Sequence, residues 1–112
     1  AGMNKNIAIS AGKGFYMTFN NGYGISVQFG WGNYSDNYDA QPSDVLDFIA
    51  LLRESNINLG REGSNTAEIA ILTPNGDLLD MQDEWGDDVK GYVEPNEILK
   101  WMNYTSKLKG EQ

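Results

Sequence analysis

The sequence contains no cysteine and no histidine. Their absence removes the thiolate nucleophile, the pairing of serine with histidine, the most common general base and the usual zinc ligands. It also excludes disulfides, which agrees with a reducing compartment. Any chemistry would depend on carboxylates, tyrosine or lysine, so we expect a protein without enzymatic activity, cofactor or metal.

Long apolar runs are missing as well. No run approaches the roughly 18 residues that a membrane span needs, and no charged and apolar leader opens the chain. Ala1 and Gly2, before Met3, resemble the remnant of an expression tag. A chain of 112 residues is long enough for one core. We therefore expect a single cytosolic domain over residues 1–112 that does not bind membranes.

Basic residues are scarce, because 8 of them oppose 16 acidic residues and leave a net charge of −8. Residues 1–35 contain no acid, whereas one stretch holds Asp83, Glu84, Asp87 and Asp88 with no base between them. Clustered acid repels nucleic acid and attracts basic partners or cations, so we expect no direct nucleic-acid binding and a partner with a basic surface. The alternative is a solvated acidic loop that keeps the protein soluble.

Residues 14–29 show the strongest local pattern. Apolar and polar residues alternate on both sides of Asn21-Gly22, a pair that tolerates the positive φ of a tight hairpin turn. This pattern predicts an antiparallel hairpin. Residues 7–10 can add a short strand before it.

The remaining chain predicts a second hairpin and two helices. Residues 66–72 and 78–81 favour paired strands around a turn at 74–77, and residues 92–93 favour a last short strand. Pro42-Ser43-Asp44 opens a short middle helix that ends near residue 54, and Pro95 opens a C-terminal helix to residue 108. The fold class is thus α+β, with an antiparallel sheet of about four strands, made of two hairpins, packed by these helices.

Three large aromatic residues, Trp31, Tyr34 and Tyr38, lie in a long loop rich in glycine and asparagine. Tyrosine and tryptophan supply contact area at low entropic cost, so this composition predicts a partner-binding surface. Alternatively, Trp31 folds over the core and the tyrosines shield the end of the sheet. Trp85 and Trp101 favour core or core-edge positions.

Several apparent motifs fail on spacing. Gly12-Lys13-Gly14 lacks the other residues of a phosphate loop, although Lys13 remains a candidate for contact with an anion. Asp36, Asn37 and Asp39 do not fit the register of a calcium loop. The paired acids of residues 83–88 lie in a polar loop, without the apolar pocket that acid and base catalysis needs.

Several short segments together resemble a family of small uncharacterised proteins of tailed bacteriophages and prophages. They are residues 13–15, 18–23, 26–30, 32–34, 66–70, 75–76, 89–93 and 98–99, with the pattern KGF, TF, NGY, SVQFG and GNY in the first half. Ser35 stands where that pattern often has cysteine, and residues 44–55 elaborate a shorter connection. The resemblance implies an accessory gene expressed in the cytoplasm of a bacterial host.

The leading hypothesis is therefore a non-enzymatic phage protein that binds and inhibits a host or antiviral-defence protein, a counter-defence role of the anti-CRISPR kind. A second hypothesis is a sponge for a nucleotide second messenger, with Trp31 and Tyr34 stacking on the base and Lys13 and Arg61 meeting phosphate. A structural or virion-associated module is a third. Each of these hypotheses is compatible with a homo-oligomer.

Overall fold

A computed structural model describes residues 6–10, 14–30, 32–36 and 64–109. The predicted middle helix lies outside the described residues, as do Lys13, Trp31, Tyr38 and Arg61. In the described part, no helix is both long enough and apolar enough to cross a bilayer.

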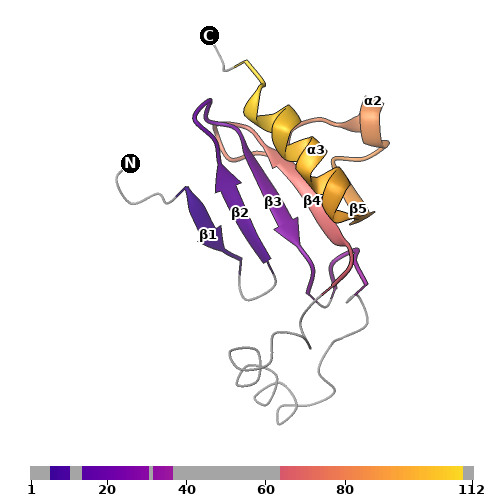
Figure 1. Ribbon diagram of the computed structural model, residues 1–112. Coiled ribbons are helices and arrows are strands. Elements are labelled where there is room, and N and C mark those ends of the chain that lie inside the picture. Colours follow the sequence, from indigo (N-terminus) through magenta and orange to yellow (C-terminus); the bar gives the residue numbers. More distant parts are fainter. Residues whose placement is uncertain (1–5, 11–13, 31, 37–63, 110–112) are drawn as a thin grey trace.

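The described residues form an α+β fold around one antiparallel sheet (Figure 1). The sheet has five strands rather than the expected four or so, and they lie side by side in chain order. The strands are β1 (Ile7–Ile9), β2 (Gly14–Thr18), β3 (Gly24–Gln28), β4 (Ala67–Leu72) and β5 (Val89–Val93). The short strand that residues 7–10 favoured is present as β1.

The hairpin predicted over residues 14–29 is confirmed. Phe15 pairs with Val27 and Met17 with Ile25, so these four apolar side chains share one face of β2 and β3. The turn closes with a hydrogen bond from the Gly22 amide to the Phe19 carbonyl at 2.9 Å. Gly22 has a φ of 90°, the backbone conformation for which the Asn-Gly pair is suited.

The second predicted hairpin is present only in part. Its first strand is β4, and its turn closes with a hydrogen bond from the Gly76 amide to the Thr73 carbonyl at 2.8 Å. The predicted return strand is reduced to an isolated bridge between Leu78 and Leu72 and a hydrogen bond from the Leu79 amide to the Ile71 carbonyl at 2.7 Å. The chain then turns away: the Met81 side chain is buried in the core, and the Gln82 amide donates to the Asp80 carboxylate at 3.0 Å. The helical turn α2 (Gln82–Trp85) starts there, inside the expected acidic loop, and β5 takes the place beside β4.

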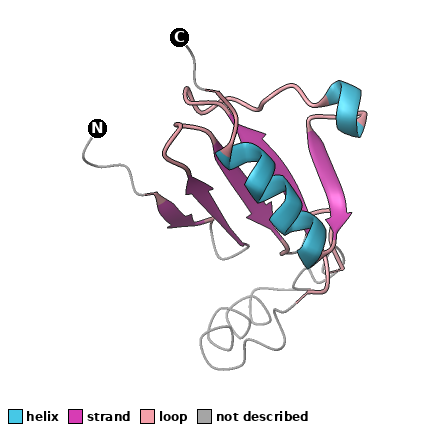
Figure 2. Cartoon of the chain, turned by 45° about the horizontal axis from the view of Figure 1, so that its top comes forward, coloured by secondary structure: helices cyan, strands magenta, loops and turns pink. Residues whose placement is uncertain are grey.

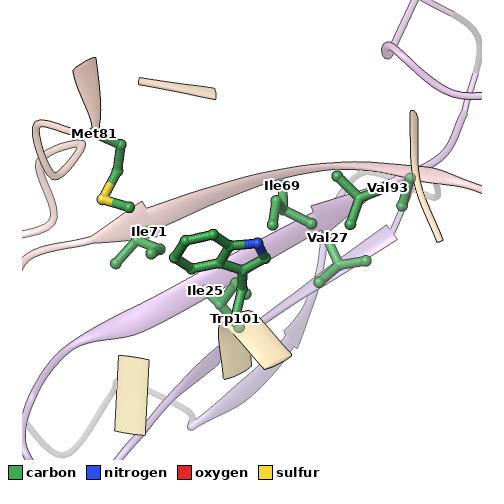
Figure 3. Close-up of a cluster of buried hydrophobic side chains, with 8 residues drawn as sticks. Ile25, Val27, Ile69, Ile71, Met81, Val93 and Trp101 are labelled. Carbon is green, nitrogen blue, oxygen red and sulfur yellow. The ribbon is translucent and has the colours of Figure 1, made fainter. Parts of the chain in front are cut away.

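The C-terminal helix α3 (Pro95–Ser106) begins at Pro95 as predicted and covers the central strands (Figure 2). Trp101 projects from it onto aliphatic side chains of β3, β4 and β5 (Figure 3). Trp85 packs against this core, with its ring perpendicular to that of Trp101 and 5.1 Å away between centroids. Both tryptophans therefore have the core or core-edge positions that the sequence predicted.

One polar side chain joins the first hairpin to the end of α3. Asn21 Nδ2 donates to the carbonyls of Thr105 and Leu108, each at 2.8 Å, while Asn21 Oδ1 accepts from the Tyr23 amide at 3.1 Å. The last carbonyls of a helix lack the amides of a following turn. Asn21 adds a donor to the Thr105 carbonyl, which also accepts from the Leu108 amide at 3.3 Å, and to the Leu108 carbonyl just beyond α3. These bonds hold the turn of the hairpin against the end of α3.

Replacing Asn21 with alanine should lower the free energy of unfolding by about 1–2 kcal/mol, because both carbonyls lose a donor in a partly buried place. Chemical denaturation measures this loss. Asn20→Ala is the matched control, since Asn20 is exposed in the same turn, and it should stay within about 0.5 kcal/mol of the parent. Equal losses in the two variants would contradict the role of Asn21.

Candidate partner-binding site

Residues 32–36, which we call the stem, are the described beginning of the predicted aromatic loop. Side-chain hydrogen bonds fasten the stem to β4 and to the residue before it. Asn33 Nδ2 donates to Glu68 Oε1 at 3.2 Å, and the Asp36 amide donates to Thr66 Oγ1 at 3.0 Å. Thr66 Oγ1 in turn donates to Asp36 Oδ1 at 2.8 Å. These hydrogen bonds therefore fix the position of the stem relative to β4.

The stem also contacts β5. The Tyr92 amide donates to the Tyr34 carbonyl at 2.8 Å. Gly91 permits this approach, since a Cβ atom at that position would lie 2.6 Å from Tyr34 Cβ. Tyr92 has a φ of 53°, a conformation that non-glycine residues seldom adopt. Such outliers persist where the surrounding contacts hold them, and here the stem supplies one of those contacts.

The contact between stem and strand joins the main chains of two exposed tyrosines. Tyr34 is 49% exposed and Tyr92 is 56% exposed, and the Tyr92 amide donates to the Tyr34 carbonyl. Tyrosine is a frequent anchor in protein interfaces because it offers a large, stiff surface with a polar tip. The sequence predicted Tyr34 as a site residue but missed Tyr92. The sequence did contain a signal for Tyr92: in the predicted short strand it is the neighbour of the apolar Val93, and neighbouring side chains of a strand point to opposite faces.

Ser35 is almost fully buried, with 1% of its surface exposed. Its amide donates to the Asn33 carbonyl at 2.7 Å, and its hydroxyl reaches the same oxygen at 3.4 Å. Ser35 is thus an interior position of the stem.

The acidic residues divide into two groups. Asp83 and Glu84 are exposed on α2, and neither makes an ion pair or side-chain hydrogen bond to another described residue. Asp88, in contrast, accepts from the Met81 amide at 3.2 Å and from Gln82 Nε2 at 3.4 Å. Asp87 accepts from the Asp88 amide at 2.6 Å. Asp87 and Asp88 therefore shape the connection between α2 and β5.

The two predicted surfaces do not meet. α2 lies where β5 begins, whereas Tyr92 and the stem lie near the other end of that strand (Figure 1). A partner that contacts the tyrosines would reach Asp83 and Glu84 only across the length of β5. The aromatic and the acidic surfaces are separate candidates.

The described residues form no evident chemical site. Among them, no three carboxylates gather closely enough to hold a metal ion. A hollow of about 360 Å³ near the start of α3 is lined by Ser64, Asn65, Glu94, Pro95 and Asn96. The described lining has a carboxylate and no basic side chain, so these residues suit an uncharged or cationic group better than a phosphate.

Comparisons with known proteins supply no identity. No family model matches the chain, and neither a curated protein nor a solved structure matches it significantly. The likeness to phage and prophage proteins stays a prediction from the sequence.

Proposed function

We propose that this chain is a non-enzymatic accessory protein of phage or prophage origin that binds and inhibits a host or antiviral-defence protein in the bacterial cytoplasm, in the manner of an anti-CRISPR protein. The observation that carries the proposal is that two exposed tyrosines, Tyr34 and Tyr92, are joined through their main chains where the stem meets β5. A main chain held in place by hydrogen bonds loses little entropy when the residues on it bind a partner.

Inhibition then follows from occupancy of the partner's surface. The tyrosine pair forms the anchor, and the exposed acids of α2, Asp83 and Glu84, attract a basic surface of the partner over a longer range. A net charge of −8 on 112 residues is modest for full mimicry of DNA. We therefore propose that the tyrosines provide most of the affinity for the partner and that Asp83 and Glu84 raise the association rate.

Replacing Tyr34 or Tyr92 with alanine should weaken partner binding roughly 30-fold each, since an aromatic anchor contributes about 2 kcal/mol or more. The partner is first captured with tagged protein from expressing bacterial cells and identified, and isothermal titration with the purified pair then measures affinity. Tyr16→Ala is the matched control: Tyr16 is 41% exposed on β2, away from the stem, and its loss should leave affinity unchanged.

The contribution of the acidic surface is tested with the same partner, by measuring association and dissociation rates. Asp83→Asn with Glu84→Gln should slow association and flatten its salt dependence, with little change in the dissociation rate. Asp88 is kept, because its carboxylate accepts the Met81 amide. Full-strength binding by the Tyr34 and Tyr92 double variant would reject the tyrosine pair. Recovery of a nucleotide instead of a protein would favour the messenger sponge.

A further inference from the structure

The two edge strands of the sheet, β1 and β5, differ in the partners of their outer main-chain groups. On β5, the Tyr92 amide is taken by the Tyr34 carbonyl, and the pairing with β4 shifts register between Ala67 and Ile69. Such irregularities prevent another strand from adding to an edge. On β1, no described residue pairs with the outer side of the strand. The open edge is therefore that of β1.

The hydrogen bonds between β1 and β2 show which main-chain groups face outward. The Ser10 amide donates to the Gly14 carbonyl, and the Thr18 amide donates to the Asn6 carbonyl, both at 2.8 Å. Antiparallel pairs alternate between bonded and non-bonded positions. Residues 6, 8 and 10 thus face β2, and the amides and carbonyls of Ile7 and Ile9 point away from the sheet.

The side chains of the same two residues are unusually exposed. Ile7 is 68% exposed and Ile9 is 79% exposed. Their cross-strand partners, Met17 and Phe15, pack against the core, so the isoleucines lie on the face that α3 covers. α3 lies over the central strands and leaves β1 to one side (Figure 2). This edge strand carries no charged residue of the kind that usually protects an edge.

The distribution of charge favours a second copy of this chain as the partner of this edge. All 16 acidic residues lie beyond residue 35, and the first 35 residues contain only Lys5 and Lys13 as charged side chains. Two copies, each of net charge −8, repel one another. In an approach through β1, the acid-free strands β1 and β2 of each copy lie nearest the axis, and the described acids, on β4, α2, α3 and the connecting segments, lie toward the other edge of the sheet.

We propose that two copies of this chain pair through β1, antiparallel, about a two-fold axis at Ala8. Ile7 of each copy then lies opposite Ile9 of the other, and the outward amides and carbonyls of these residues bond across the axis. Such an interface is self-complementary, because the same residues serve both copies. The joined sheet ends at the two β5 edges, which the register shift against β4 and the hydrogen bond from Tyr92 to Tyr34 interrupt, so we expect assembly to stop at the dimer.

Sedimentation equilibrium of the purified chain, from about 1 µM to about 1 mM, tests the proposal. We expect a monomer and dimer equilibrium, with the larger species at twice the 12.4 kDa of one chain. Ile7→Lys and Ile9→Lys should each weaken association roughly 100-fold, because each places a charge in an apolar contact. Leu99→Lys is the control: Leu99 is 57% exposed on α3 and its replacement should leave the equilibrium unchanged.

Amide hydrogen exchange locates the interface without a substitution. The Ile7 and Ile9 amides should gain protection as the concentration rises, while the Ala8 amide, which faces β2, is protected in the monomer as well. Higher salt should not weaken the dimer, since it screens the repulsion between the acidic copies. A monomer throughout, species larger than a dimer, or a dimer whose Ile7 and Ile9 amides stay unprotected would overturn the proposal. Protection of these amides only by the captured partner would assign the edge to that partner instead.

Discussion

Replacing Trp101 with alanine should lower the free energy of unfolding by about 3–5 kcal/mol. Only 7% of Trp101 is exposed, and its ring lies edge to face with Trp85 and with Tyr104, each at 5.1 Å between centroids. Trp101 Nε1 also donates to Glu97 Oε2 at 3.3 Å. A small domain is stable by only about 5–15 kcal/mol, so the variant should approach unfolding at ordinary temperature.

Chemical denaturation with circular dichroism measures this loss. Leu99→Ala, in the same helix but 57% exposed, is the control and should cost less than about 1 kcal/mol. Equal losses at the two positions would show that α3 is not held to the sheet through Trp101. Loss of the Trp85 contact should appear as a change in the near-ultraviolet spectrum, which reports the packing of the two rings.

Replacing Gly91 with valine should reduce partner binding roughly 1,000-fold, the combined loss of two aromatic anchors. The new Cβ would stand 2.6 Å from Tyr34 Cβ and 3.4 Å from the Tyr34 carbonyl oxygen, so the stem has to leave β5. The hydrogen bond between Tyr92 and Tyr34 is then lost, and the two tyrosines separate. The crowding should also cost about 1–3 kcal/mol of stability.

Titration of the identified partner measures the effect of Gly91→Val, and denaturation shows that the variant is folded at the working temperature. Lys90→Ala is the control in the same strand. It removes a half-exposed ion pair with Glu97, 3.5 Å between Nζ and Oε2, but leaves the stem in place. Lys90→Ala should therefore keep full affinity. Undiminished binding by Gly91→Val would mean that the placement of the stem on β5 is irrelevant to the partner.

Short-range patterns predicted the parts of this fold that depend on neighbours in the chain. The hairpin of residues 14–29 has an alternation and an Asn-Gly turn within a few residues of each other, and both are present in the structure. The helix that starts at Pro95 is likewise a local pattern with a local start signal. The prediction of a return strand over residues 78–81 was wrong beyond its first residues. Apolar and polar residues also alternate in this segment when the chain turns inward and buries Met81.

The candidate site was only partly predictable for the same reason. Tyr34 was visible in its loop, but its neighbour Tyr92 lies 58 positions further along the chain, on a strand that pairs with β4. In the sequence, Asp88 looks like any other acid of a surface loop. In the structure, its carboxylate accepts a hydrogen bond from the Met81 amide. A charge in a sequence does not reveal whether its oxygen atoms already have donors.

By itself, the sequence determined that this chain has neither thiol nor imidazole chemistry, that its acids avoid the first 35 residues, and that it folds as an α+β domain with a terminal helix. These properties depend on composition and on local spacing. The tertiary structure alone decided that β5 pairs with β4, that the stem bonds to β5 at Tyr92, and that no described residue pairs with the outer side of β1. These features depend on contacts between segments far apart in the chain, which no local pattern encodes.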